Sequence, residues 1–155
     1  MLRPINPPGP SIPGISQAML LSEGRLLILS GHVPFDDTGT IVAGDRATQL
    51  DQVFRNMQAT LHAAGADFSA VARLTIYVRD YDPAELPAIR AVRDRWINAA
   101  CPPASALIGV AALAFPDMLV EGGCDGVPAA VVQPTRSRPG GGAGGTRAPS
   151  GAGRA

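Results

Sequence analysis

The 155-residue sequence contains no lysine, so all thirteen of its basic residues are arginines. This absence excludes a Schiff base on a lysine and a P-loop, because both need a lysine amine. Cysteine is also scarce: Cys101 and Cys124 allow at most one disulfide, and the sequence opens without a secretion signal. No apolar run approaches the roughly 20 residues of a membrane-spanning helix. We therefore expect a cytoplasmic protein with no membrane partner.

Residues that usually carry catalytic chemistry are few. The sequence has only two histidines, His32 and His62, and its acidic residues show no metal-ligand spacing, so we predict no metal site. The GxSxG pattern of an activated serine is absent, and neither cysteine stands beside a basic partner. His32 follows the end of a predicted strand, where side chains often enter a pocket, whereas His62 is expected on a helix surface. The sequence thus indicates no activated protein nucleophile.

The formal charges cancel, with thirteen basic and thirteen acidic residues. Residues 134–155 hold four of the arginines and no acidic residue, so residues 1–133 are mildly acidic. A nucleic-acid binder needs a clustered basic face to neutralise phosphates. We therefore expect no nucleic-acid partner.

Prolines crowd residues 3–14 and predict an extended arm, because each proline fixes φ and removes a backbone donor. Residues 15–22 and 25–30 are rich in apolar residues and are separated by Glu23-Gly24, a pattern that predicts a β-hairpin. The second of these strands is apolar at every position from 26 to 29, which indicates burial on both faces.

Two amphipathic helices are predicted farther along the chain. Asp45 can cap the first, which Gly65 ends, and the Asp82–Glu85 capping box begins the second, which runs to about Ile97. A strand with alternating faces is predicted between the helices at 70–79, and two short strands follow the second helix at 106–110 and 118–120. The predicted order of the elements is ββαβαββ, and two helices can shield only one face of a sheet of this size.

The other face of such a sheet needs a cover, and we expect self-association into a symmetric oligomer to supply it. We expect Gly122-Gly123-Cys124-Asp125-Gly126 to interrupt the last strand after Glu121. The domain is accordingly placed at residues 1–126. Residues 127–155 form a tail rich in glycine, proline and arginine, which we expect to be disordered because it has too few apolar residues to offset its ordering entropy.

The order and spacing of several short segments resemble the RidA/YjgF reactive-intermediate deaminase family over roughly residues 9–121. The matching segments are Ser16-Gln17-Ala18, Ser30-Gly31-His32-Val33-Pro34, Thr38-Gly39, the helix from Gln49 to Gly65, Pro103-Ala104-Ser105 and Leu119-Val120-Glu121. The resemblance implies an α+β fold like that of chorismate mutase, in which a mixed sheet carries both helices on one face. It also implies a homotrimer whose clefts lie between subunits and bind small carboxylates. It also implies hydrolysis of enamines and imines to 2-oxo acids and ammonia, with no cofactor.

The same resemblance implies two catalytic positions that face one shared cleft. Glu121 matches a family glutamate that orients water or accepts a proton, and Ser105 falls where the family has a carboxylate-binding arginine. Serine cannot supply the bidentate charged contact of an arginine. Arg73, Arg90 and Arg93 are the alternative sources of such a contact.

Further positions are implied to bind the substrate. The backbone of Ser30 and Gly31 lines the cleft in the family pattern. Ile15 and Ile89 stand where the family often has a tyrosine and an asparagine, and Leu107 belongs to the same group, so the pocket is expected to be more apolar than in a standard deaminase.

Three functions follow from these features. The first is a RidA-like deaminase whose specificity is altered by Ser105. The alternative is a non-catalytic trimer of the same fold that binds or senses a small ligand. A third, the endoribonuclease or translation-inhibitor activity often attached to the family, conflicts with the acidic body.

Overall fold

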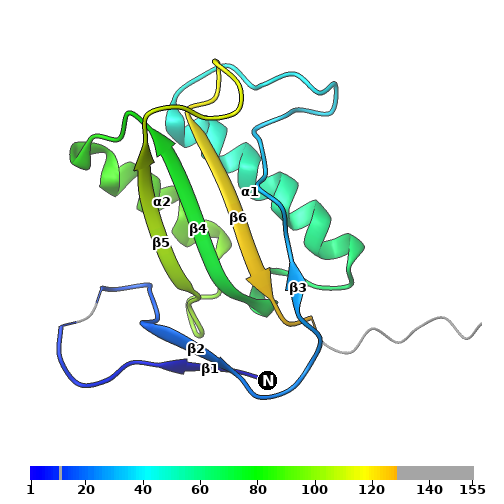
Figure 1. Cartoon of the computed structure of the whole chain (residues 1–155), viewed down its shortest axis with the longest axis vertical. Helices are drawn as coiled ribbons and strands as arrows, with labels where there is room; N and C mark the ends of the chain where they lie inside the picture. The colour runs from blue at the N-terminus through cyan, green and yellow to red at the C-terminus, as the bar shows by residue number, and fades with distance from the viewer. Residues whose placement is uncertain (11, 129–155) are drawn as a thin grey trace, which may run out of the picture.

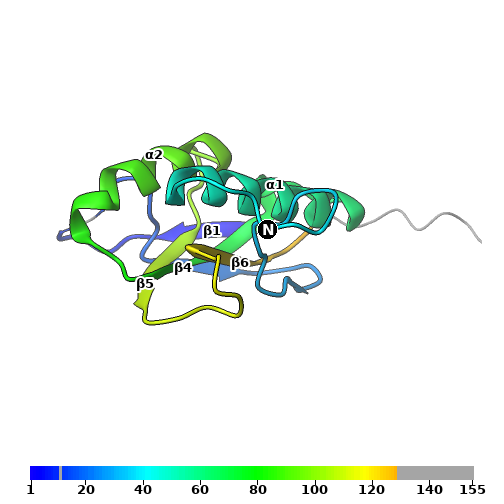
Figure 2. The ribbon, with the colours of Figure 1, turned by 90° about the horizontal axis from the view of Figure 1, so that it is seen from above.

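The computed structural model describes residues 1–10 and 12–128, which form a four-stranded sheet, a separate two-stranded ribbon and two helices (Figure 1). Both helices lie on one face of the larger sheet (Figure 2). The strands are β1 (Leu2–Ile5), β2 (Ala18–Leu21), β3 (Leu27–Ile28), β4 (Val71–Arg79), β5 (Ala104–Val110) and β6 (Val120–Gly126); the helices are α1 (Arg46–Ala63) and α2 (Leu86–Trp96), with single 3-10 turns at Phe68–Ala70 and Pro83–Glu85. From β2 onward the order is ββαβαββ, so the predicted α+β class is confirmed.

The larger sheet has the strand order β3-β6-β4-β5. Strand β4 runs parallel to β5 and antiparallel to β6, and β3 is antiparallel to β6, so the sheet is mixed as predicted. A bridge between His32 and Gly122 continues the pairing beyond β3. At the opposite edge, Ser16 pairs with Ala104 and attaches the proline-rich arm to β5.

The predicted hairpin of residues 15–22 and 25–30 is wrong. Strand β2 pairs with β1, inside the proline-rich segment, and β3 pairs with β6 from the other end of the sequence. Within one chain Leu29 is 7% exposed and Ile28 is 69% exposed, so burial of residues 26–29 on both faces stays a prediction that needs the cover expected from self-association. Pairing with the central strand β6 buries Leu29 in the core, and this long-range contact prevails over the local turn signal.

The predicted interruption after Glu121 is wrong as well. Strand β6 continues to Gly126, and its residues alternate between buried and half-buried positions. A Cβ at Gly122 would lie only 2.8 Å from Val53 Cγ1, so a glycine there lets α1 pack directly on the strand. The last strand was predicted at 118–120, whereas β6 begins at Val120 and ends at Gly126. Residues 129–155 of the predicted tail lie outside the described residues.

Helix α1 forms as its sequence predicts. Asp45 accepts a hydrogen bond from the backbone of Thr48 at 2.8 Å and caps the helix. The apolar face is fully buried, and Phe54 stacks on Trp96 of α2 with ring centroids 6.0 Å apart. The capping box at Asp82–Glu85 is present, but it begins a 3-10 turn that leads into α2. The two helices thus share one core with β4 and β6.

Gln49 is a buried polar residue that holds the loop before β6. Its Nε2 donates to the carbonyls of Val42 (3.1 Å) and Asp117 (2.9 Å), and its Oε1 accepts from the backbone of Leu119 (2.7 Å). Its side chain therefore links α1 to two loops at the end of the molecule where β6 begins.

Replacing Gln49 with leucine is expected to lower the free energy of unfolding by about 3 kcal/mol, because three backbone groups lose the partly buried hydrogen bonds that they make with its side chain. Urea denaturation measures this change. Gln58→Leu is the matched control, since Gln58 lies on the same helix and makes no side-chain hydrogen bond among the described residues; its effect is expected within about 0.5 kcal/mol. Equal losses in the two variants would contradict the role of Gln49.

Candidate functional site

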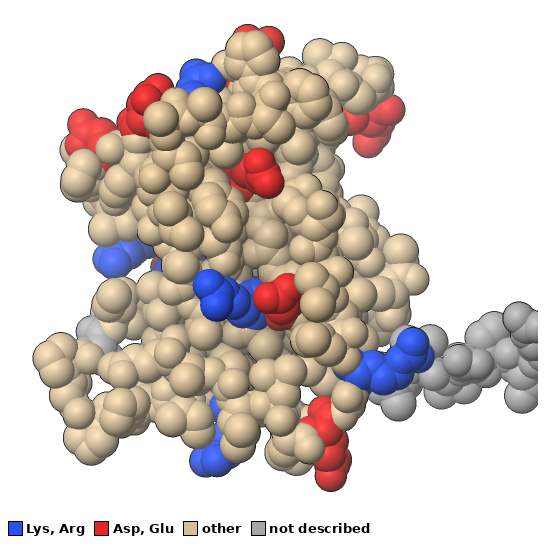
Figure 3. Space-filling view, in the orientation of Figure 1, with Lys and Arg blue, Asp and Glu red and all other residues tan. Residues whose placement is uncertain are grey.

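The face of the sheet away from the helices carries a cavity of about 530 Å³. Its floor is formed by outward-facing residues of β4 and β6, and part of its wall by residues 112–114 of the loop between β5 and β6. Figure 3 views this face and shows basic and acidic side chains side by side near its centre, surrounded mainly by uncharged surface. We call it the open-face cavity; its lining residues include Gly31, Arg73, Thr75, Tyr77, Glu121, Gly123 and Asp125.

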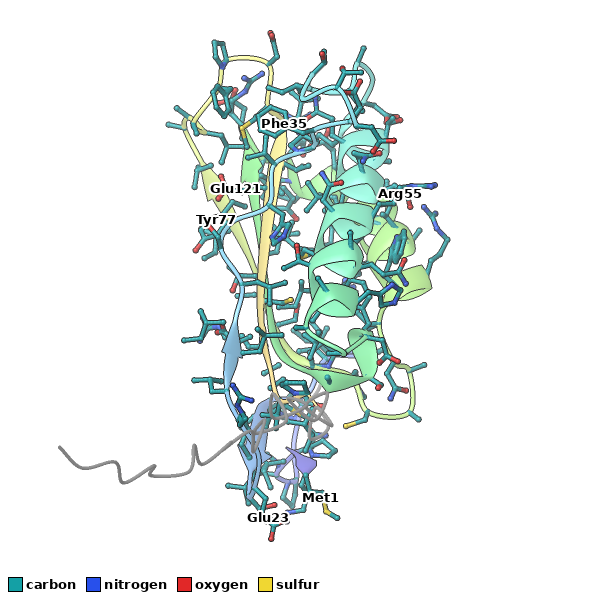
Figure 4. The ribbon with its side chains drawn as sticks, turned by 90° about the vertical axis from the view of Figure 1, so that its right-hand side faces the viewer. Met1, Glu23, Phe35, Arg55, Tyr77 and Glu121 are labelled. Carbon is teal, nitrogen blue, oxygen red and sulfur yellow. The ribbon has the colours of Figure 1, made fainter. Side chains whose placement is uncertain are left out.

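Glu121 and Gly31 meet in the open-face cavity. Glu121 stands directly across from Tyr77 in the β4–β6 register, and Figure 4 shows both residues on the side of the sheet away from α1. A Cβ on Gly31 would overlap Glu121 Oε1, so the carboxylate lies against the backbone of Gly31 and only a glycine leaves room for it. Ser30 is exposed and is not among the residues that line the cavity.

His32 is held on both ring nitrogens. Nδ1 lies 2.9 Å from the carbonyl oxygen of Ser30, and Nε2 lies 2.9 Å from Thr60 Oγ1 on α1. Its backbone also exchanges hydrogen bonds with Gly122. His32 therefore connects residues 30–32 to α1 and β6 by hydrogen bonds, and these bonds help to position Gly31. His62 is exposed, as expected.

Cys124 is unsuited to act as a nucleophile. It is 3% exposed, and burial together with the nearby charge of Asp125 raises the pKa of its thiol to about 12. The described residues contain no group of three His, Cys, Asp or Glu side chains placed to hold a metal ion. Neither helix in this part of the chain has the length and apolarity that crossing a membrane requires.

A second cavity, of about 290 Å³, lies between β5, α2 and the N-terminal arm. We call it the β5–α2 cavity. It contains the other predicted site residues together, and two arginines of α2 also line it. The residues are Ile12, Ile15, Ile76, Tyr81, Leu86, Ile89, Arg90, Arg93, Ser105 and Leu107.

The two groups of predicted residues lie on opposite faces of the sheet. Ser105 pairs with Leu74, which faces the helices, whereas Glu121 pairs with Tyr77. Positions 74 and 77 are three residues apart on one strand, so their side chains point to opposite faces. One chain therefore does not bring Ser105 and Glu121 into one cleft. Arg73 lines the open-face cavity, on the side of Glu121.

The fold and these two cavities define a class of small α+β proteins with a mixed sheet and two helices on one face. The family model described as Endoribonuclease L-PSP matches residues 10–124. The chain therefore belongs to this family, which is the RidA/YjgF family of the resemblance. The match extends three residues beyond Glu121, in agreement with the continuous β6.

Individual relatives agree with this assignment. The chain is 38% identical over 99 residues to protein DfrA of Myxococcus xanthus, covering 63% of this chain and 73% of that protein. It is 32% identical over 91 residues to a 2-iminobutanoate/2-iminopropanoate deaminase of Dermatophagoides farinae, covering 58% and 69%. Some other curated relatives are matched over only about half of their length.

Among solved structures, a protein of unknown function from the conserved Rid protein family of Yersinia pestis superposes with a TM-score of 0.72 at 36% identity. The superposition covers 81% of this chain and 98% of that chain. The fold that the resemblance implies is thus also found in a solved structure of the Rid protein family.

Proposed function

We propose that this protein hydrolyses the imine or enamine forms of 2-oxo acids, releasing ammonia. The observation that carries the proposal is the contact between the Glu121 carboxylate and the backbone of Gly31 at the wall of a cavity of about 530 Å³, which has room for a small molecule. Membership of a family whose relatives include named 2-iminobutanoate/2-iminopropanoate deaminases supports the same chemistry.

In the proposed reaction, water adds to the carbon of the C=N bond and the C–N bond of the resulting carbinolamine then breaks. Glu121 accepts a proton from the attacking water and passes it to the nitrogen, which gives the neutral carbinolamine. Glu121 then moves the proton of the carbinolamine hydroxyl to the same nitrogen, so that ammonia leaves and the C=O bond of a 2-oxo acid forms. No covalent bond to the protein is needed, which accords with the raised pKa of the Cys124 thiol.

The site is proposed to form between subunits of a homotrimer in the cytoplasm. Glu121 and Gly31 face one side of the sheet and Ser105 faces the other, so a shared cleft takes one group from each of two copies. Exposed apolar residues at the free edge of the sheet, such as Ile28, are suited to be covered by a neighbouring copy.

Trapping with semicarbazide tests the activity. An amino-acid oxidase generates imines from a panel of amino acids, and the rate of semicarbazone formation is followed with and without the protein. Accelerated loss of trappable imine is expected. Saturable binding of 2-oxo acids without any acceleration would instead favour a non-catalytic ligand-binding trimer, which the serine at position 105 also suits.

A further inference from the structure

The β5–α2 cavity combines an apolar wall with positive charge. Six of its lining residues are aliphatic, Arg90 and Arg93 supply the charge, and no acidic residue lines it. A cavity of this composition suits a small anion with an apolar body. At roughly 30 Å³ per small heavy group, its 290 Å³ accommodates about ten heavy atoms.

Arg93 is the buried cation of this cavity, with 4% of the residue exposed. Its Nε and Nη2 both donate to one oxygen of Asp94, at 2.8 and 2.6 Å, and the Asp94 side chain is 54% exposed. Nη1 makes no hydrogen bond among the described residues. A buried guanidinium needs partners for its remaining donors, so Arg93 is left with unused capacity to bind an anion.

The N-terminal arm closes over this guanidinium. Gly14 adopts a φ of +73°, and a Cβ there would lie 2.9 Å from Arg93 Nη2. Ser16 holds the arm in place, with Oγ donating to the carbonyl of Pro102 at 2.5 Å. The arm thereby shields Arg93 from water, which strengthens any charge-assisted hydrogen bond that it makes.

The other candidate arginines are placed less favourably. Arg90 is only partly buried, and Arg73 lies on the opposite face of the sheet. Ser105 lines the same cavity as Arg93, and its hydroxyl makes no side-chain hydrogen bond in the described part of the chain. Arg93 and Ser105 thus offer one charged and one neutral donor to the same cavity.

We propose that Arg93 binds the substrate carboxylate, with the Ser105 hydroxyl as a second donor, and that the aliphatic wall selects 2-imino acids with side chains of about leucine size. The identity of the ligand as an imine rests on the proposed deaminase function. Binding of a carboxylate by Arg93 does not depend on that function. A 2-imino acid derived from leucine has about nine heavy atoms, which the cavity accommodates.

Binding of the stable 2-oxo acid tests this role without any turnover. Isothermal titration of the full chain with 4-methyl-2-oxopentanoate, its methyl ester and pyruvate is the experiment. Arg93→Gln is expected to weaken binding of the acid about 30- to 100-fold and to leave the weak binding of the ester unchanged. The wild type is expected to prefer the larger acid to pyruvate.

Arg95→Gln is the matched control, because it removes the same charge from an exposed position of α2 outside the cavity. Binding is expected to stay within about twofold in this variant. Adding Ser105→Arg to Arg93→Gln is expected to restore binding, since it returns a guanidinium to the cavity. Unchanged affinity for the acid in Arg93→Gln would overturn the assignment. A loss of affinity in Arg90→Gln that Arg93→Gln does not show would overturn it as well.

Asp94→Asn tests the same claim from an exposed position and stays informative if Arg93→Gln does not fold. Removing the carboxylate that competes for Arg93 is expected to tighten binding of the acid about threefold or more. Unchanged or weaker binding would overturn the proposal. If binding depends on Arg93 but the protein does not accelerate imine loss, only the deaminase function is rejected. If the protein turns over imines but binding does not depend on Arg93, only the assignment of Arg93 is rejected.

Discussion

Replacing Glu121 with glutamine is expected to reduce kcat for imine hydrolysis by about 10²- to 10⁴-fold, the usual contribution of a positioned general base. The amide keeps the size of the side chain and its place against Gly31, so the affinity for 2-oxo acids is expected to stay within a few-fold. The measurement is the semicarbazone assay combined with titration of the product acid.

Asp125→Asn is the matched control for this variant. Asp125 lies on the same strand and lines the same open-face cavity, but it stands opposite Arg73 and is not among the described residues that pack against Gly31. Its loss is expected to change kcat by less than about threefold. Equal losses for the two variants would show that the cavity needs negative charge in general rather than the carboxylate of Glu121.

Replacing Gly31 with alanine is expected to lower kcat/KM by about 10- to 100-fold, because a misplaced catalytic group loses much of its effect. The added methyl group overlaps Glu121 Oε1 and forces the carboxylate away from the backbone. The displaced atom is the end of a flexible side chain, so the melting temperature is expected to change by no more than about 3 °C.

Gly123→Ala separates this effect from the general cost of a methyl group in the cavity. A Cβ at Gly123 meets Ser30 O only at 3.7 Å, an ordinary contact. Activity is expected to stay within about threefold of the wild type. A Gly31→Ala protein with full activity would mean that the position of Glu121 beside Gly31 is not needed for catalysis.

Local sequence signals predicted the helices well. The cap at Asp45 and the apolar spacing of α1 depend on residues that are close together in the sequence, so the helix can be predicted from a short stretch of the chain. Strand pairing was harder, because β3 pairs with β6 about a hundred residues away, and the choice depends on how much apolar surface the pairing buries. Gly122 was misread for a similar reason, since the approach of Val53 that requires a glycine is a tertiary contact.

The candidate site was partly predictable. The order of short segments in the sequence singled out Gly31, Glu121, Ser105 and Leu107. In the structure Gly31 lies beside Glu121, and Ser105 and Leu107 line one cavity. The face on which each group lies depends on the register of β4 with its neighbours, which the sequence does not specify. Spacing also could not distinguish Arg93 from its neighbours, because its burial depends on the arm that folds over it.

In the proposed trimer, two copies of the chain build one active site from opposite faces of the sheet. Mixing two inactive variants tests it: Glu121→Gln lacks the proton acceptor, and Ser105→Phe fills the β5–α2 cavity. In trimers formed at random by refolding the two together, about a quarter of the sites combine an intact group from each variant, so activity is expected to return to about a quarter of the wild-type value. No recovery from two folded variants, beside an active wild type, would contradict a site shared between copies.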